Sequence, residues 1–216
     1  MRQIRSDSVL ESALVRGSAL LMTAAQPPRR ALPARLDPDR ADAAVPAAET
    51  RLRSVGLMRI NHAGEVAAQA LYHGQSMTAR DAKTRQHMLS AAMEEKDHLA
   101  WCEARLAELG ARPSRLQAFW YGGSFAIGAL AGLAGDRWSL GFVNETERQV
   151  AEHLDEHIAQ LSDSDVRSRT ILEQMRLDEQ RHGNEAALAG GRPLPAPVRR
   201  LMRRVAAVMK WTAGRF

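Results

Sequence analysis

The sequence predicts an all-α protein built on a four-helix bundle, and its composition, apolar periodicity and breaker residues carry this prediction. Alanine, leucine, arginine and glutamate dominate the 216 residues, while aromatic side chains make up only 5%. Such a balance favours helices over strands. From Glu49 onward apolar residues recur at steps of three and four, which is typical of amphipathic helices. The length suits one domain with tails and leaves little room for two catalytic domains.

Four long helices are expected, separated by residues that end or cap a helix. Gly110 and Pro113 end the second, and Gly190-Gly191 end the fourth. The serine and aspartate cluster of residues 162–165 ends the third helix and caps the fourth. The expected spans are Glu49 to Ala79, Asp81 to Leu109, Arg137 to Leu161, and from that cluster to Ala189.

The first 48 residues mix arginine, alanine and proline without a sustained apolar period. This composition predicts a flexible leader that is dispensable for the fold. Asp7 and Glu11 disfavour a mitochondrial presequence, and the apolar run from Leu20 to Ala25 is too short for a secretory signal. The bundle is therefore expected to occupy residues 49–192.

Twenty uncharged residues, 116–135, separate the second and third long helices. Their length permits a transmembrane span, but five glycines weaken that interpretation. A span would also place the acidic and histidine residues before and after it in different compartments. We therefore predict a crossover that runs about 30 Å back along the bundle, with its outer face touching lipid.

The C-terminal residues 193–216 predict a short basic amphipathic helix. Val198, Leu201, Met202, Val205 and Met209 fall on one side, opposite a group of arginines, and no acidic residue follows Glu185. This pattern suits the interface of an anionic bilayer, and packing on the bundle is the alternative. The net charge of +5 comes without zinc-binding cysteines or a helix-turn-helix signal, so we expect a membrane surface as partner and no nucleic acid.

A single cysteine, Cys102, excludes an intrachain disulfide and suits a reducing compartment. Its apolar neighbours predict a buried, inert thiol.

Two of the seven histidines have a glutamate three residues earlier: Glu95 precedes His98, and Glu179 precedes His182. A three-residue step keeps both side chains on one helix face, so both can reach one ion. One such pair is a weak signal, but an additional glutamate stands one helix earlier each time. Glu65 precedes Glu95 by 30 residues, and Glu147 precedes Glu179 by 32. In an antiparallel hairpin that separation places the lone glutamate level with the pair.

The apolar stripes around Glu65 and Glu147 indicate that these carboxylates face the core. Burying them is costly unless they are paired or bind metal. One glutamate from each of two helices and Glu-x-x-His from the other two form the ligand set of di-iron carboxylate proteins. Four carboxylates offset the charge of two divalent ions, and mixed oxygen and imidazole ligation suits iron or manganese. The sequence thus predicts a ferritin-like four-helix bundle with two iron ions per chain, bound by Glu65, Glu95, His98, Glu147, Glu179 and His182.

The segment from Arg59 to Glu65 (RINHAGE), followed by Tyr72, and the later Glu95-x-x-His98 and Glu179-x-x-His182 stand in the order of a known family. Over residues 50–216 the chain resembles the demethoxyubiquinone hydroxylases of ubiquinone biosynthesis. Asn61 and Leu154 depart from residues that are common in that family, and neither position is a ligand.

The resemblance implies a membrane-bound monooxygenase that uses O2 to hydroxylate 2-polyprenyl-3-methyl-6-methoxy-1,4-benzoquinol. By the same resemblance Glu95 and Glu179 bridge the irons, and Glu65 and Glu147 bind one each. The expected location is peripheral, on the cytoplasmic face of a bacterial inner membrane, with the matrix side of the mitochondrial inner membrane as the alternative. The resemblance also leaves room for a homo-oligomer and for contacts with other ubiquinone-biosynthesis proteins.

Residues beside the ligands are expected to orient the imidazoles. Asp178 should accept a hydrogen bond from His98, and Glu94 one from His182, with Arg181 neutralising Glu94. Ordinary surface charge is the alternative for these three residues. For His153 two roles are equally compatible with the sequence, a contact with the ligands and an ordinary polar contact. His62 is expected either to line the substrate path or to cap the ligand cluster. The remaining histidines, His73, His87 and His157, are expected to face solvent.

Two other functions compete with the hydroxylase. A ferritin-type iron store uses the same ligand types but forms a large soluble shell, which the apolar crossover and the cationic tail disfavour. A noncatalytic helical protein on a membrane surface leaves the repeated ligand spacing unexplained.

Overall fold

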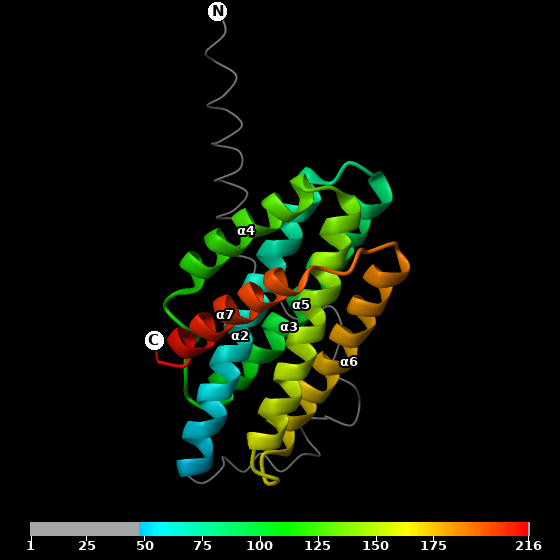
Figure 1. Cartoon of the computed structure of the whole chain (residues 1–216). Coiled ribbons are helices and arrows are strands. Elements are labelled where there is room, and N and C mark those ends of the chain that lie inside the picture. The colour runs from blue at the N-terminus through cyan, green and yellow to red at the C-terminus, as the bar shows by residue number, and fades with distance from the viewer. Residues whose placement is uncertain (1–47, 216) are drawn as a thin grey trace, which may run out of the picture.

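A computed structural model describes residues 48–215, and this part of the chain forms six helices without strands (Figure 1). The predicted leader lies outside the described residues apart from Ala48, so it stays a prediction, as does the division into leader, bundle and tail. Each of the four long helices begins and ends within about two residues of its predicted bounds. The helices are α2 (Ala48–Thr78), α3 (Ala82–Glu108), α4 (Gln117–Leu133), α5 (Asp136–Gln160), α6 (Val166–Leu188) and α7 (Ala196–Ala213).

Two helical hairpins form the bundle. The helices α2 and α3 make one hairpin, α5 and α6 make the other, and α4 carries the chain from the end of α3 back to the start of α5 (Figure 1). This order, two hairpins joined by one long crossover, confirms the predicted all-α ferritin-like bundle. None of the described helices is both long and apolar enough to pass through a bilayer.

Short polar residues fix where the long helices begin. The Asp81 carboxylate caps α3 by accepting a hydrogen bond from the Thr84 amide at 2.9 Å. The Asp165 carboxylate caps α6 in the same way through the Ser168 amide at 3.0 Å. It also accepts hydrogen bonds from the Arg105 guanidinium at 2.8 Å and from the Ser54 hydroxyl. One buried carboxylate therefore ties the start of α6 to α3 and α2.

The crossover α4 packs against α2 through glycines. A Cβ atom added at Gly128 would overlap the Leu71 carbonyl, and one at Gly74 would overlap the backbone of Phe125 and Ala129. The two backbones therefore approach each other more closely than larger residues would permit. Four large apolar side chains on the outer face of α4 are exposed: Phe119, Ile127, Leu130 and Leu133.

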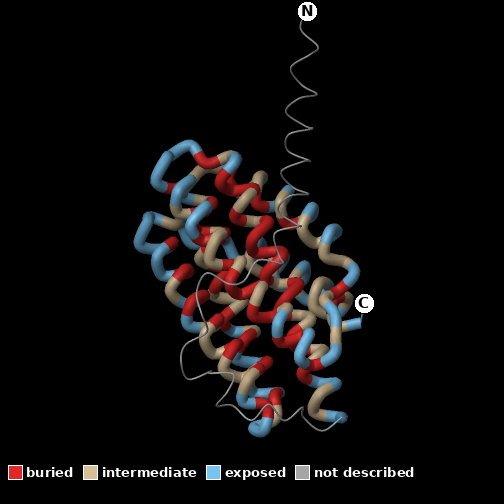
Figure 2. Tube along the Cα trace, turned by 180° about the vertical axis from the view of Figure 1, so that it is seen from behind, coloured by how far each residue is buried: buried red, intermediate tan, exposed pale blue. Residues whose placement is uncertain are grey.

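The interior consists of two apolar clusters with a polar layer between them. One cluster gathers Leu57, Trp101, Leu154 and Met175 with their neighbours, and the other includes Tyr72, Met88, Leu140, Val143 and Ala186. On every long helix the residues between these two groups include the predicted metal ligands. Figure 2 shows the buried residues running along the inside of the bundle. Cys102 is buried in the first cluster, as predicted.

The C-terminal helix α7 lies across the bundle against α2 and α5. Gln149 donates a hydrogen bond to the Arg199 carbonyl at 3.3 Å, and Lys210 donates one to His153 at 3.2 Å. Ala213 is fully buried, while Leu201 is 61% and Trp211 57% exposed. The helix thus packs on the bundle along one edge and presents an apolar stripe outward along another.

Candidate metal centre

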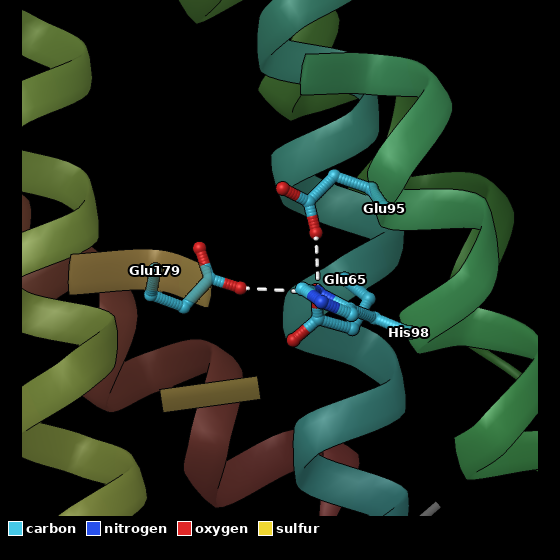
Figure 3. Close-up of side chains that lie close together, drawn as sticks. All are labelled: Glu65, Glu95, His98 and Glu179. Atoms are coloured by element: carbon cyan, nitrogen blue, oxygen red, sulfur yellow. Dashed lines mark hydrogen bonds and ion pairs between the residues drawn. The ribbon is translucent and has the colours of Figure 1, made fainter. Parts of the chain in front are cut away.

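All six predicted ligands are buried and converge from the four long helices, between the two apolar clusters. Glu65 comes from α2, Glu147 from α5, and the two Glu-x-x-His pairs from α3 and α6. One ligand atom from each of Glu65, Glu95, His98 and Glu179 lies within 4.8 Å of the others. In Figure 3 these four side chains point toward one another. The level placement expected from the spacing of about 30 residues is therefore present in the folded chain.

Glu95 and Glu179 each direct one carboxylate oxygen toward each of the two imidazoles. The Nδ1 atom of His98 lies 3.0 Å from Glu95 Oε2 and 3.2 Å from Glu179 Oε1. The Nδ1 atom of His182 lies 3.5 Å from Glu95 Oε1 and 3.6 Å from Glu179 Oε2. Both carboxylates therefore stand between the two halves of the site.

The outer nitrogen of each imidazole has a carboxylate of its own. His98 Nε2 lies 3.2 Å from Asp178, and His182 Nε2 lies 3.2 Å from Glu94. Arg181 forms an ion pair with Glu94. These are the three contacts expected from the sequence. In the neutral rings, as metal binding requires, these contacts favour the tautomer that carries hydrogen on Nε2 and directs the Nδ1 lone pair toward the centre of the site.

Several buried polar atoms of the centre lack a hydrogen-bond partner within the described part of the chain. They are Glu65 Oε2, Glu95 Oε1, Glu147 Oε2, both carboxylate oxygens of Glu179, and His182 Nδ1. Native proteins satisfy nearly all buried polar atoms, so a group of orphans in one place needs an explanation. Carboxylate oxygens and imidazole nitrogens are the donors that iron and manganese take in proteins. The residues therefore fit a metal centre.

The sequence is similar to those of known proteins. Residues 53–213 match the family model described as ubiquinone biosynthesis protein COQ7. The chain belongs to the COQ7 family. It is 60% identical, over 77% of each chain, to a 3-demethoxyubiquinol 3-hydroxylase of Xanthomonas axonopodis pv. citri. It is 62% identical to the protein of the same name from Cupriavidus necator, over 78% of this chain and 81% of the relative.

The charges at the centre of this COQ7 family member call for a cation. Burial and the neighbouring carboxylates raise the pKa values of Glu65 and Glu147 well above the ordinary value of a glutamate. Burial alone would lower the pKa of the imidazoles, but the carboxylates around His98 and His182 raise it. The raised pKa values of the carboxylates and of the imidazoles have the same cause, which is an excess of negative charge in a layer from which water is largely excluded. Divalent ions would neutralise that surplus.

Tyr72 of α2 contacts Glu147, one of the six predicted ligands. Its hydroxyl donates a hydrogen bond to Glu147 Oε1, and its pKa is raised by burial and by the charge of Glu147. Both side chains line a small hollow between α2 and α5, together with Ala68, Leu71, Gln75, Val143 and Thr146. Tyr72 stands seven residues, close to two helical turns, after Glu65, but its partner comes from another helix and could not be read from the sequence.

The other histidines lie outside this ligand layer. His62 is buried, and its Nε2 lies 3.1 Å from Glu103 of α3. His153 contacts Lys210 of α7, and its ring lies 3.7 Å from that of His157. No contact between His153 and the six predicted ligands occurs among the described residues.

The expectation that His157 faces solvent is wrong. This residue is only 5% exposed and donates a hydrogen bond to the Asn61 side chain at 2.9 Å. The reason is tertiary, because His157 faces Asn61 of α2 and lies beside His153, which in turn contacts Lys210 of α7. His73 and His87 are half-buried, and His73 lies 3.2 Å from the Tyr121 hydroxyl.

Proposed function

We propose that this chain is a 3-demethoxyubiquinol 3-hydroxylase that uses two iron ions and O2 to hydroxylate the ring of 2-polyprenyl-3-methyl-6-methoxy-1,4-benzoquinol. The names of its close COQ7 family relatives support the reaction. The group of orphaned carboxylate oxygens and imidazole nitrogens in one buried layer carries the proposal that metal performs it. When bound, two ferrous ions supply electrons for the stepwise reduction of O2.

The geometry suggests how the ligands are shared between the ions. Glu65 lies 3.4 Å from His98 and would serve one ion with it. Glu147 and His182 would serve the other. Glu95 and Glu179 reach both imidazoles with separate oxygens, as bridging carboxylates must. In this assignment each ion would be held by one imidazole, one carboxylate of its own, and the two carboxylates of Glu95 and Glu179 shared with the other ion.

The surrounding residues keep this arrangement in place. Asp178 and Glu94 hold the outer nitrogens of the imidazoles and so fix their orientation. The apolar clusters on either side keep bulk water from the layer, which strengthens the electrostatic interactions inside it.

We also propose peripheral attachment to the cytoplasmic face of a bacterial inner membrane. Figure 1 shows α4 and α7 running obliquely across the same side of the bundle, and both contact α2. Each exposes large apolar side chains, and α7 adds arginines that suit anionic lipid. The hollow at Tyr72 includes Leu71 and Gln75, which α4 covers, and Glu147, which lies two residues before the Gln149 that contacts α7. A polyprenyl tail could stay in lipid while the ring approaches Glu147 by this route.

The decisive test is complementation in a bacterium that lacks its own hydroxylase gene and accumulates demethoxyubiquinone. The chain should remove this intermediate, and Glu147→Gln should fail to do so. Glu152→Gln is the matched control, because Glu152 is an exposed residue of the same helix. The proposal would be overturned if the purified ferrous protein, given the quinol and a reductant, consumed no O2.

Light scattering tests the rival of an iron store. A small oligomer agrees with the hydroxylase, whereas a large shell would favour storage.

A further inference from the structure

We propose that Tyr72 is a positioning residue that binds one oxygen of Glu147 and thereby presents only the other oxygen to metal. This inference rests on the proposed two-ion centre and adds a residue to it.

The two oxygens of Glu147 have different surroundings. Oε1 accepts the hydrogen bond from the Tyr72 hydroxyl, while Oε2 is buried without a hydrogen-bond partner in the described chain. Glu147 itself is 1% and Tyr72 2% exposed, so water does not compete freely for either atom. A carboxylate held in this way can offer one oxygen to one ion.

The other ligand carboxylates are held differently. Glu95 and Glu179 face imidazole nitrogens with both oxygens, and Glu65 approaches His98. Within the described residues, Glu147 is the one member of the set that accepts a hydrogen bond from a hydroxyl group. Tyr72 therefore restrains a single ligand, and its loss should affect one ion more than the other.

The position of Tyr72 follows from the geometry of α2. It is seven residues, close to two helical turns, beyond Glu65, so both side chains lie on one buried face of α2. Gln75 on the next turn is anchored by hydrogen bonds to the Ser139 carbonyl and hydroxyl at 2.9 Å each. These contacts hold this part of α2 against the start of α5 and keep the phenol in reach of Glu147.

Metal titration of the purified full-length chain tests the proposal, with Co²⁺ added anaerobically as the probe. The chain has two tyrosines, so Tyr121→Phe is a matched control for Tyr72→Phe. The wild-type and Tyr121→Phe proteins should bind two ions. Tyr72→Phe should bind the first ion normally and the second about 10- to 100-fold more weakly, the usual effect of losing such an outer contact. The visible spectrum of the second Co²⁺ ion should change with it.

The outcomes separate this inference from the proposed function. If the wild-type chain bound no pair of ions, the two-ion centre itself would fall. If Tyr72→Phe bound two ions as tightly as the wild type, the centre would stand and the role of Tyr72 would be refuted. A purely structural phenol would lower the melting temperature of the metal-free protein and leave both affinities unchanged, which also refutes the inference.

A measurement on the unmutated sequence covers the case in which Tyr72→Phe does not fold. Protein labelled with 3-fluorotyrosine should give two ¹⁹F resonances, which Tyr121→Phe assigns. During titration with Zn²⁺ the Tyr72 resonance should shift as Glu147 takes up its ion, while the Tyr121 resonance stays in place. A Tyr72 resonance that ignores both equivalents of Zn²⁺ would contradict the inference.

Discussion

The carboxylates behind the imidazoles are the clearest single-residue determinants of the centre. Asp178 is buried and faces His98 from the next hairpin, so it fixes the ring without touching the ligand layer itself. Replacing it with alanine would leave a buried ring nitrogen without its acceptor.

We therefore predict that Asp178→Ala weakens metal binding by about 10- to 100-fold, while Asp178→Asn, which retains an acceptor oxygen, loses less. The measurement is metal affinity by competition with a chelator of known strength. Asp155→Ala is the control, because that exposed aspartate pairs with Arg176 at the surface. Equal metal affinities of Asp178→Ala and the wild type would show that Asp178 has no role in metal binding.

The neighbouring pair His153 and His157 should make stability depend on pH. Burial and the Lys210 ammonium lower the pKa of His157 to about 4, and burial, His157 and Lys210 lower that of His153 to about 2, from the ordinary 6.5. Below pH 6.5 the unfolded chain binds protons that the folded chain refuses. Above pH 6.5 both rings are neutral in the folded and the unfolded chain, so they do not affect the free energy of unfolding. As the pH falls from 6.5 toward 4, this free energy decreases.

Urea unfolding of the metal-free protein between pH 7.5 and pH 4.5 tests this prediction. The free energy of unfolding should lose up to about 1.4 kcal/mol per pH unit for each histidine in the acidic part of that range. In the variant His153→Gln/His157→Gln this part of the slope should vanish. An unchanged slope would mean that both rings accept protons in the folded state.

At the residue scale, the sequence was sufficient to predict the residues whose role depends on a spacing of three along one helix. Glu95 and His98, or Glu179 and His182, are neighbours on one turn, so the pattern is visible in the chain itself. The link from Tyr72 to Glu147 and the burial of His157 depend on which helices meet side by side. No local period contains that information.

At the scale of elements, α4 is held by close backbone contact with α2. Gly128→Ala should destabilise the fold by about 1 to 3 kcal/mol, because the added methyl group meets the Leu71 carbonyl and must push α4 outward. The measurement is chemical unfolding of both proteins under the same conditions.

Gly123→Ala on the same helix is the matched control. A Cβ at Gly123 meets nothing within 4 Å, so this change should raise stability by up to about 1 kcal/mol through helix propensity. Similar effects of both substitutions would show that packing against α2 does not decide the place of α4.

The exposed stripe of α7 should provide membrane affinity. We predict that Leu201→Glu/Val208→Glu lowers binding to anionic vesicles by at least about tenfold per substitution, because apolar area is lost and negative charge is added. Co-sedimentation with vesicles measures the effect. Leu188→Glu at the exposed end of α6 is the control and should bind as the wild type does. Undiminished binding of the double variant would exclude α7 as the attachment site.

The sequence defined the elements better than their docking. Gly110, Gly190 and the capping carboxylate of Asp165 stand where helices end or begin, so the bounds could be predicted closely. Which side of α7 meets the bundle could not. Met202 and Leu201 belong to one apolar run, yet the first is half-buried against the bundle and the second is exposed.

For the whole molecule, the buried carboxylates that would bind metal also lower the stability of the metal-free chain. Four carboxylates lie between apolar clusters, where burial already raises the pKa of Glu65 and Glu147. Without metal the carboxylates of this layer repel one another, and the proposed ions would link the two hairpins by binding ligands from both. Stability should therefore respond in opposite ways to a loss of charge, depending on whether ions are bound.

We predict that Glu65→Gln/Glu147→Gln raises the melting temperature of the metal-free protein and abolishes the rise caused by metal. For the wild type, free Co²⁺ at 100 times its dissociation constant should add about 2.7 kcal/mol per site, or roughly 5 to 10 °C, and a chelator should reverse this gain. The exposed pair Glu152→Gln/Glu156→Gln removes the same charge from α5 and should keep the full response. If the buried double variant melted below the metal-free wild type and still gained stability from Co²⁺, these glutamates would be structural residues, and the ions would have to bind elsewhere.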